Sequence, residues 1–330
     1  MRAAVATRYG PPDVVRVTEV EVPTVGEHDV LVEVHATTVN RTDCAYRAAH
    51  PFFMRAFTGL RRPRRQILGT ELAGVVAAVG SAVTTFAVGD RVFGYNEGAF
   101  AFGAHAEYVA LPQDGLLAPI PANVGFPEAA AGTEGSHYAL AFIRAARVEA
   151  GQSVLVYGAT GAIGSAAVQL LKSVDATVTA VCDTAHLDLV RGLGADRVVD
   201  YTTEDFTRDP QRYDAVFDAV GKSTFGRCRR LLEPGGVYLS SELGPLWQNL
   251  YLPLLTRWSR GAKARFPFPH ESQEMVRHLA RLMQSGRFRP VIDRTYPLDE
   301  IVDAYRYVET GRKTGNVVIE VVRADRGRPG

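Results

Sequence analysis

The chain contains only three cysteines, Cys44, Cys182 and Cys228. They are odd in number and far apart, and none belongs to a C-x-x-C pair, which excludes a disulfide framework and a cysteine-rich structural zinc site. Free thiols fit a reducing compartment, so we expect a cytoplasmic protein. The first ten residues hold no apolar run, and no secretory signal is predicted there.

An excess of charge of one sign is also lacking. Lys and Arg number 37, Asp and Glu 36, and the net charge is +1. A protein built to bind nucleic acid would carry a clear basic excess, so we expect no nucleic-acid partner. The 46% apolar and 22% charged residues are typical of globular proteins, and 330 residues suggest about two domains.

No uncharged run is best explained as a membrane span, so we expect no membrane partner. The run from Ala150 to Leu171 is long enough but carries four glycines, so it is better explained by a strand, a turn and a buried helix. The run from Leu72 to Gly89 is broken by Gly80-Ser81 and fits two strands around a turn.

Two kinds of pattern follow each other along the chain. The first 120 residues are rich in short strands, expected at 14–20, 29–36, 72–79 and 91–93, which indicates a barrel-like domain. Apolar strands then alternate with helices, which predicts a parallel sheet buried on both faces. The expected strands are 154–157, 178–182, 198–200, 215–220 and 237–240, and the expected helices are 162–172, 187–193 and 229–232. Helices near 274–283 and 298–307 precede a strand at 316–322, which we expect to return to the first domain.

The segment from Gly158 to Gly164 is a glycine-rich turn between a strand and a helix. Small residues let backbone N–H groups approach a pyrophosphate, and the start of the helix supplies a favourable field. Asp183 follows Gly164 by about 20 residues, after the next strand, where an acid can accept both ribose hydroxyl hydrogens and repel a 2′-phosphate. Asp183 can also cap the following helix, and both roles can hold together.

Several motifs together match a known family. They are 67–74 (ILGTELAG), 88–94 (VGDRVFG), the glycine turn, 193–196 (LGAD), 200–201 (DY), 233–236 (EPGG) and 313–318 (KTGNVV). With them the chain resembles the zinc-independent branch of the medium-chain dehydrogenase/reductase superfamily, the quinone oxidoreductase-like proteins. The resemblance implies an α/β fold with a GroES-like catalytic domain, 1–122 and 288–330, and a Rossmann domain, 123–287, as well as a homodimer.

The resemblance also implies a cofactor, NAD(P)H, bound in a cleft with a small-molecule substrate. It places Thr160, Gly161, Ala162 and Ile163 near the pyrophosphate, Asp183 and Tyr201 near the adenosine half, and Ser136, Val220, Leu243 and Asn316 among the remaining cofactor contacts. Relatives ordinarily prefer NADPH, and many have a neutral residue where Asp183 stands. Asp183 therefore tips our expectation slightly towards NADH.

Zinc-dependent relatives have a Cys and a His where this chain has Asn40 and Thr70. Amide and hydroxyl groups are poor zinc ligands, and Glu71 alone cannot hold a catalytic zinc, so we expect no metal. Without a Lewis acid, hydride donation to a carbon that is already electrophilic remains possible, as in quinones and α,β-unsaturated carbonyls.

That chemistry needs a hydrogen-bond donor near the substrate oxygen. Asn40 and Tyr46 are the candidate catalytic residues, and His137 is a third candidate that fits a core-facing helix residue better. Asn40 can equally stabilise a turn, and Tyr46 can simply pack.

Other readings stay open. The arginines of 61–65 suit a solvated loop or a rim that attracts anions, and the apolar stretch 246–255 suits a pocket wall or a subunit or domain contact. At the level of function, the alternatives are a non-catalytic NAD(P)H-binding redox sensor or assembly partner, and an alcohol dehydrogenase-type enzyme.

Overall fold

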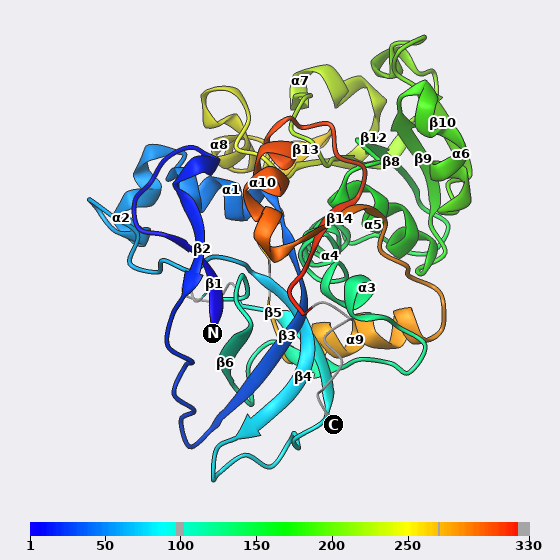
Figure 1. Ribbon diagram of the computed structural model, residues 1–330. Coiled ribbons are helices and arrows are strands. Elements are labelled where there is room, and N and C mark those ends of the chain that lie inside the picture. The colour runs from blue at the N-terminus through cyan, green and yellow to red at the C-terminus, as the bar shows by residue number, and fades with distance from the viewer. Residues whose placement is uncertain (97–101, 270, 323–330) are drawn as a thin grey trace. The chain divides into compact units, whose positions relative to one another are not determined.

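The computed structural model describes residues 1–96, 102–269 and 271–322. Spatial contacts divide the chain into two compact units (Figure 1). Unit 1 comprises Met1–Glu134, Glu271–Ser285 and Val291–Gly330, and unit 2 comprises Gly135–His270 and Gly286–Pro290. Residues 123–134 and 271–285, which we expected in the Rossmann domain, group with unit 1, and the last eight residues of the expected first domain lie outside the described part. The domain boundaries remain a prediction.

Unit 1 is built on a largely antiparallel sheet with the order β14-β15-β3-β4-β5-β7, in which β6 also pairs with β3. Its strands are β3 (Asp29–Val39), β4 (Glu71–Val79), β5 (Arg91–Tyr95), β6 (Tyr108–Pro112), β7 (Leu117–Pro119), β14 (Ile292–Pro297) and β15 (Asn316–Glu320). A separate ribbon pairs β1 (Arg2–Ala6) with β2 (Val15–Glu19). The C-terminal strand therefore returns to the first domain, as predicted, because β15 pairs with β3.

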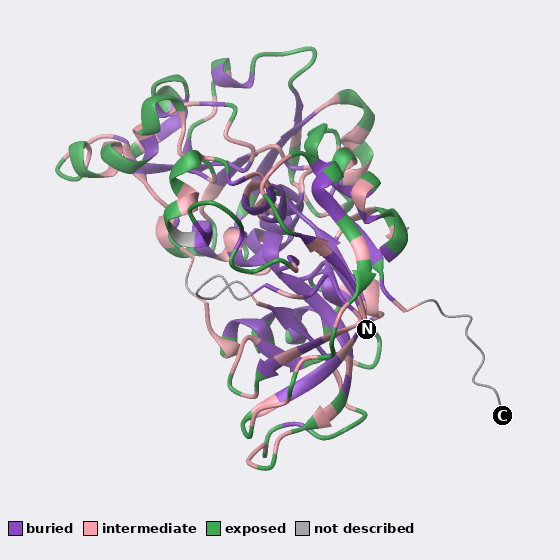
Figure 2. Ribbon diagram, turned by 60° about the vertical axis from the view of Figure 1, so that its left-hand side comes forward, coloured by how far each residue is buried: buried purple, intermediate pink, exposed green. Residues whose placement is uncertain are grey.

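The helices of unit 1 are α1 (Arg41–Ala48), α2 (Arg55–Thr58), α3 (Phe126–Ala130), α9 (Gln273–Gln284) and α10 (Ile301–Glu309). Alternate residues of β3 enter the core, and α10 joins it through Ile301 and Tyr305. Figure 2 shows this buried interior along the strands. The arginines of 61–65 are all exposed, as expected of a solvated loop.

Unit 2 holds a six-stranded, fully parallel sheet with the order β10-β9-β8-β11-β12-β13. Its strands are β8 (Ser153–Tyr157), β9 (Thr177–Cys182), β10 (Arg197–Asp200), β11 (Tyr213–Asp218), β12 (Leu232–Ser240) and β13 (Lys263–Arg265). The order reverses between β8 and β11. In sheets of this kind, ligands bind beyond the carboxyl ends of the strands at such a reversal.

The helices of unit 2 are α4 (Glu134–Ala146), which starts at the last residue of a unit 1 segment, α5 (Ala162–Lys172), α6 (Leu187–Gly192), α7 (Phe225–Cys228) and α8 (Gln248–Leu255). Helix α5 has the predicted bounds because its small residues are buried against β8 and β9. The helix expected at 229–232 is wrong: α7 ends at Cys228, a short 3₁₀ turn follows, and Leu232 already begins β12.

Among the described residues, no helix is both long enough and apolar enough to cross a membrane. The uncharged run 150–171 folds as β8, the glycine turn and α5, as expected. The run 72–89 supplies most of β4 and the loop after it, not two strands.

Candidate active site

The glycine turn of unit 2 connects β8 to α5. Gly158 has a φ of +82°, and a Cβ there would lie 2.4 Å from Val220 Cγ1. A Cβ on Gly164 would lie 2.1 Å from the carbonyl oxygen of Gly158. These two positions therefore accept only glycine, and they hold the start of α5 close against the end of β8.

Gly161 is different, because the nearest atom to a Cβ placed there is the Gly158 oxygen at 3.7 Å. Gly161 is the N-cap of α5, and its position offers no side chain to bond the first backbone N–H groups of the helix. Those N–H groups carry the positive end of the helix dipole. An uncapped helix start in front of open space fits a pyrophosphate, and a side chain at Gly161 would fill that space.

Asp183 follows directly after β9. It is the N-cap residue of a 3₁₀ turn, but its side chain makes no capping bond. Its carboxylate instead contacts Nδ1 of His186, and both side chains are partly exposed. Tyr201, also exposed, packs edge-on against Tyr157 with ring centroids 6.4 Å apart. The contact between Asp183 and His186 was not predicted from the sequence.

Ser136 lies on α4 and is 1% exposed, and its Oγ has no hydrogen-bond partner among the described residues. A buried hydroxyl without a partner is costly unless a ligand bonds to it, which fits a cofactor contact. Its neighbour His137 is buried beside Tyr138, with ring centroids 4.3 Å apart. Val220 and Leu243 are half-buried in unit 2.

Asp218, at the end of β11, was missed by the sequence analysis. Its carboxylate accepts hydrogen bonds from the backbone N–H of Ser223 at 2.9 Å and of Val220 at 3.3 Å, and from the Tyr238 hydroxyl at 3.0 Å. Burial raises the pKa of Asp218. This acid shapes the turn that carries Val220, and the only sequence signal was its place at a strand end.

Asn316, by contrast, lies in unit 1 at the start of β15. Its side-chain Nδ2 donates to the Val291 carbonyl at 3.0 Å. The described residues thus place nine of the ten predicted cofactor residues in unit 2 and one in unit 1.

Asn40 caps helix α1 of unit 1. Its Oδ1 accepts the backbone N–H of Asp43 at 2.9 Å, while an Asp43 oxygen accepts the N–H of Asn40 at 3.1 Å. Its Nδ2 donates to Thr70 Oγ1 at 2.7 Å. The turn-stabilising role is therefore present, and the second hydrogen on Nδ2 remains for a substrate oxygen. Tyr46 packs edge-on against Phe102, with ring centroids 4.3 Å apart.

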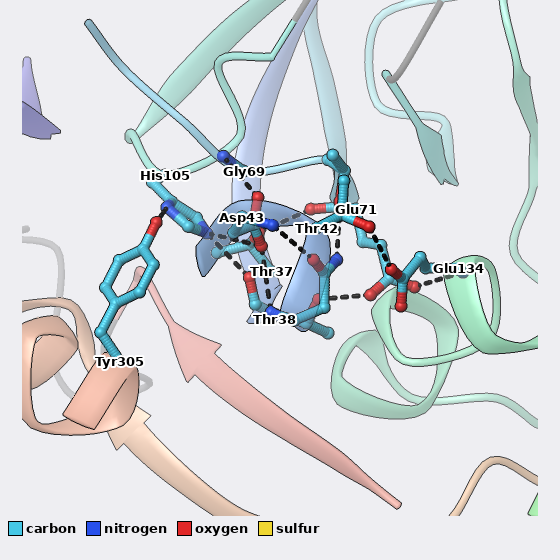
Figure 3. Close-up of polar contacts among 11 residues, drawn as sticks. Thr37, Thr38, Thr42, Asp43, Gly69, Glu71, His105, Glu134 and Tyr305 are labelled. Atoms are coloured by element: carbon cyan, nitrogen blue, oxygen red, sulfur yellow. Dashed lines mark hydrogen bonds and ion pairs between the residues drawn. The ribbon is translucent and has the colours of Figure 1, made fainter. Parts of the chain in front are cut away.

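The carboxylate of Asp43 is fully buried beneath this cap. It also accepts the N–H of Gly69 at 3.2 Å, and burial raises its pKa well above the usual range. His105 Nε2 donates to the Thr38 carbonyl at 2.7 Å, while its Nδ1 lies 3.3 Å from the Tyr305 hydroxyl (Figure 3). Burial lowers the pKa of His105 to about 4, so the ring is neutral.

Glu71 is the second buried acid of this cluster (Figure 3). Its Oε1 accepts the Thr133 hydroxyl at 2.7 Å and the Glu134 N–H at 2.7 Å, and its Oε2 accepts the Thr38 hydroxyl. Its carboxylate therefore ties β3 and β4 to the start of α4.

Glu134 stands beside Glu71 and accepts the Thr42 hydroxyl at 2.8 Å. Burial, reinforced by the charge of Glu71, raises the pKa of Glu134 to about 7. Lys313 is the nearby cation, and burial lowers its pKa. Glu134 was not singled out from the sequence, and Lys313 appeared there only as part of the motif 313–318, because charged side chains carry no sign of burial.

The residues at the expected zinc positions do not fit zinc. Asn40 and Thr70 bond to each other, and the Glu71 carboxylate is occupied by protein donors. Over 1–96, 102–269 and 271–322, no three His, Cys, Asp or Glu side chains gather as a metal site would require. A neutral amide and a hydroxyl are weak ligands for this ion.

Two known protein families match segments of this chain. The family described as "Alcohol dehydrogenase GroES-like domain" matches residues 26–122, and "Zinc-binding dehydrogenase" matches residues 193–319. The fold and the turn define a nucleotide-binding oxidoreductase with a GroES-like domain. The chain belongs to the medium-chain dehydrogenase/reductase superfamily, which confirms the predicted resemblance.

Three relatives illustrate the match. The chain is 34% identical to 2-methylene-furan-3-one reductase from Solanum lycopersicum, covering 98% of this chain and 79% of the relative. It is 32% identical to the NADPH-dependent alkenal/one oxidoreductase, chloroplastic, of Arabidopsis thaliana, covering 97% and 79%. The solved quinone oxidoreductase from Coxiella burnetii superposes with a TM-score of 0.87 at 26% identity, covering 98% and 99%.

Proposed function

We propose that this protein is an NAD(P)H-dependent reductase of α,β-unsaturated carbonyl compounds or quinones. The uncapped start of α5 in front of Gly161 is the observation that carries the cofactor half of the proposal. The named activities of the tomato, Arabidopsis and Coxiella relatives support the acceptor half. When bound, a reduced nicotinamide supplies the hydride that adds to the electron-poor carbon of the acceptor.

The chain's own residues have separate tasks in this proposal. The first N–H groups of α5 bind the pyrophosphate, and the unpartnered Ser136 hydroxyl bonds to the nicotinamide half. The free hydrogen on Asn40 Nδ2 donates to the acceptor oxygen as negative charge develops there. Water supplies the proton that completes reduction of the carbon–carbon double bond or the quinone. Tyr46 is the alternative donor.

We further propose that NADH is accepted somewhat better than NADPH, because the Asp183 carboxylate repels a 2′-phosphate. The contact with His186 moderates this preference, because the imidazole occupies one of the two carboxylate oxygens that would accept ribose hydroxyl hydrogens. Both cofactors are therefore expected to work.

A cytoplasmic homodimer is our proposal for the setting of this reaction. Three free, buried cysteines suit a reducing compartment, and the dimer rests on the resemblance alone.

The experiment is a matrix of acceptors and cofactors. Oxidation of NADH and of NADPH would be followed by absorbance with benzoquinone, phenanthrenequinone, an enone such as 3-nonen-2-one, and a simple aldehyde. Turnover with enone or quinone, and none with aldehyde, is expected. Binding of both cofactors without turnover of any acceptor would favour the redox-sensor alternative. Aldehyde turnover that needs added zinc would favour an alcohol dehydrogenase.

A further inference from the structure

Glu134 is a buried acid that has no task in the reaction proposed above. It is 6% exposed, and the only hydrogen bond of its carboxylate among the described residues is with the Thr42 hydroxyl on α1, at 2.8 Å (Figure 3). Thr42 itself is half-buried. The contact therefore links a buried carboxyl to a residue that a small molecule can reach.

Charged groups of both signs surround Glu134. Burial and the charge of Glu71 on β4 raise the pKa of Glu134 to about 7. The hydroxyl contact and two cations, Lys313 before β15 and Arg41 on α1, oppose this rise. Asp43 is a further acid close by, and burial raises its pKa well above the usual range. Glu134 can therefore both hold and release a proton at neutral pH, as general acid catalysis requires.

A threonine hydroxyl can pass a proton on, because it donates one hydrogen and accepts another. When Glu134 is protonated, it donates to Thr42 Oγ1, and the hydrogen of Thr42 is free to point away from Glu134. When Glu134 is ionised, the Thr42 hydroxyl donates to its Oε1. The separation of 2.8 Å suits both directions.

Thr42 also lies close to the candidate donor of the acceptor site. It is the second residue of α1, and Asn40 is the N-cap of the same helix. Two residues of a helix rise by only about 3 Å. In an enone, the carbon that must receive a proton is bonded to the carbonyl carbon. An enone whose oxygen is held by Asn40 Nδ2 therefore presents this carbon near the first turn of α1.

We propose that Glu134 supplies, through the Thr42 hydroxyl, the proton that completes enone reduction, an inference that rests on the proposed function. Hydride from the nicotinamide adds to the carbon remote from the carbonyl group and leaves an enolate. The Thr42 O–H bond then breaks as a C–H bond forms at the neighbouring carbon, and Thr42 takes the proton of Glu134. Glu134 is left as a carboxylate with Lys313 nearby, and water restores its proton before the next turnover.

A quinone places a different demand on this pair. Hydride transfer to a quinone leaves the negative charge on an oxygen, which exchanges protons with water without help. Loss of the relay should therefore slow the reduction of enones and spare that of quinones. An effect confined to enones separates proton delivery from general damage to the site.

The test compares variants of matched shape in the full chain. For wild type, kcat/KM with 3-nonen-2-one should be constant in acid and fall above about pH 7 as Glu134 ionises. Glu134→Gln should lose about a hundredfold at about pH 6 and show no such fall, while its activity with benzoquinone is retained. Thr42→Val should show the same selective loss, and Thr42→Ser, which keeps the hydroxyl, should retain most of the enone activity.

Two further measurements check the interpretation. Glu149→Gln, an exposed acid elsewhere on the chain, should keep the wild-type pH profile, and thermal unfolding followed by circular dichroism checks that each variant folds. An infrared band of a protonated carboxyl should disappear as the pH rises through about 7, be absent from Glu134→Gln and be shifted in Thr42→Val.

The outcomes separate this inference from the proposed function. Enone turnover without a pH-dependent fall near neutrality, or equal losses with enone and quinone in Glu134→Gln, would overturn the role of Glu134 and leave the reductase standing. Equal enone activity of Thr42→Val and Thr42→Ser would overturn the relay. Absence of turnover with every acceptor in wild type would overturn the proposed function and this inference together.

Discussion

At the residue scale, the proposed cofactor preference rests on one carboxylate. Replacing Asp183 with Ser removes the charge that repels a 2′-phosphate, so the ratio of kcat/KM for NADPH over NADH should rise by about tenfold, corresponding to about 1.4 kcal/mol. Asp188→Ser, nearby on α6 and almost fully exposed, is the control. An unchanged ratio would contradict the ribose role of Asp183.

His186 gives the same site a second test. Removing its imidazole by His186→Ala leaves both oxygens of the Asp183 carboxylate open to a ribose. The ratio of kcat/KM for NADPH over NADH should therefore fall with this change. An unchanged ratio would show that the contact plays no part in cofactor selection.

Gly161 separates cofactor binding from folding. A valine there meets no protein atom closer than 3.7 Å at its Cβ, so the chain should fold, yet the side chain fills the space before α5. We expect the Kd for NADH to rise at least about a hundredfold, measured by fluorescence titration. Gly192→Val, at the end of α6 with open space around it, should bind normally.

The buried acids that join β4 to α4 are the feature to test at the element scale. The pKa of Glu134 is raised to about 7 from 4.5, so the folded chain holds a proton that the unfolded chain releases. The contribution of Glu134 to stability should therefore be greatest below about pH 4.5 and decline as the pH rises towards 7. Relative to Glu134→Gln, the decline should reach up to about 3 kcal/mol, measured by urea unfolding. The exposed Glu149→Gln should follow wild type, and parallel pH profiles for Glu134→Gln and wild type would refute the shift.

Most helices and strands of the parallel-sheet unit could be predicted from the sequence. Strands β8, β9 and β10 and helix α5 lie within one residue of prediction, because a buried parallel strand is a short apolar run and glycine marks its end. Helix α9 was equally clear from its amphipathic pattern. Short elements such as β13 and α7 were not, since three or four residues hold too little pattern.

The residues of the candidate site were harder to predict from the sequence, because most of them are brought together by tertiary packing. The glycine turn shows itself because backbone geometry restricts residue choice at Gly158 and Gly164. The partners of Glu71 and Asp218 come from strands and loops far apart in the chain. Whether an acid is solvated or buried is decided by tertiary packing, which no local pattern records.

Metal dependence is a property of the whole molecule. Since Asn40 and Thr70 are neutral and bonded to each other, exhaustive treatment with a chelator should leave both the reductase activity and the melting temperature within error of the untreated protein. Metal analysis of the purified chain is the accompanying control. Activity that is lost on chelation and restored by zinc would contradict this reading.

The pairing of β15 with β3 affects how the chain can fold during its synthesis. Val39 leaves the ribosome long before its partner Val317, whereas every strand of the parallel sheet lies between Ser153 and Arg265. The parallel sheet can therefore close while translation continues, and the GroES-like sheet must wait until β15 has been made. A truncated or stalled chain would leave β3 with an open edge, so nascent copies should depend on chaperones until Asn316–Glu320 emerges.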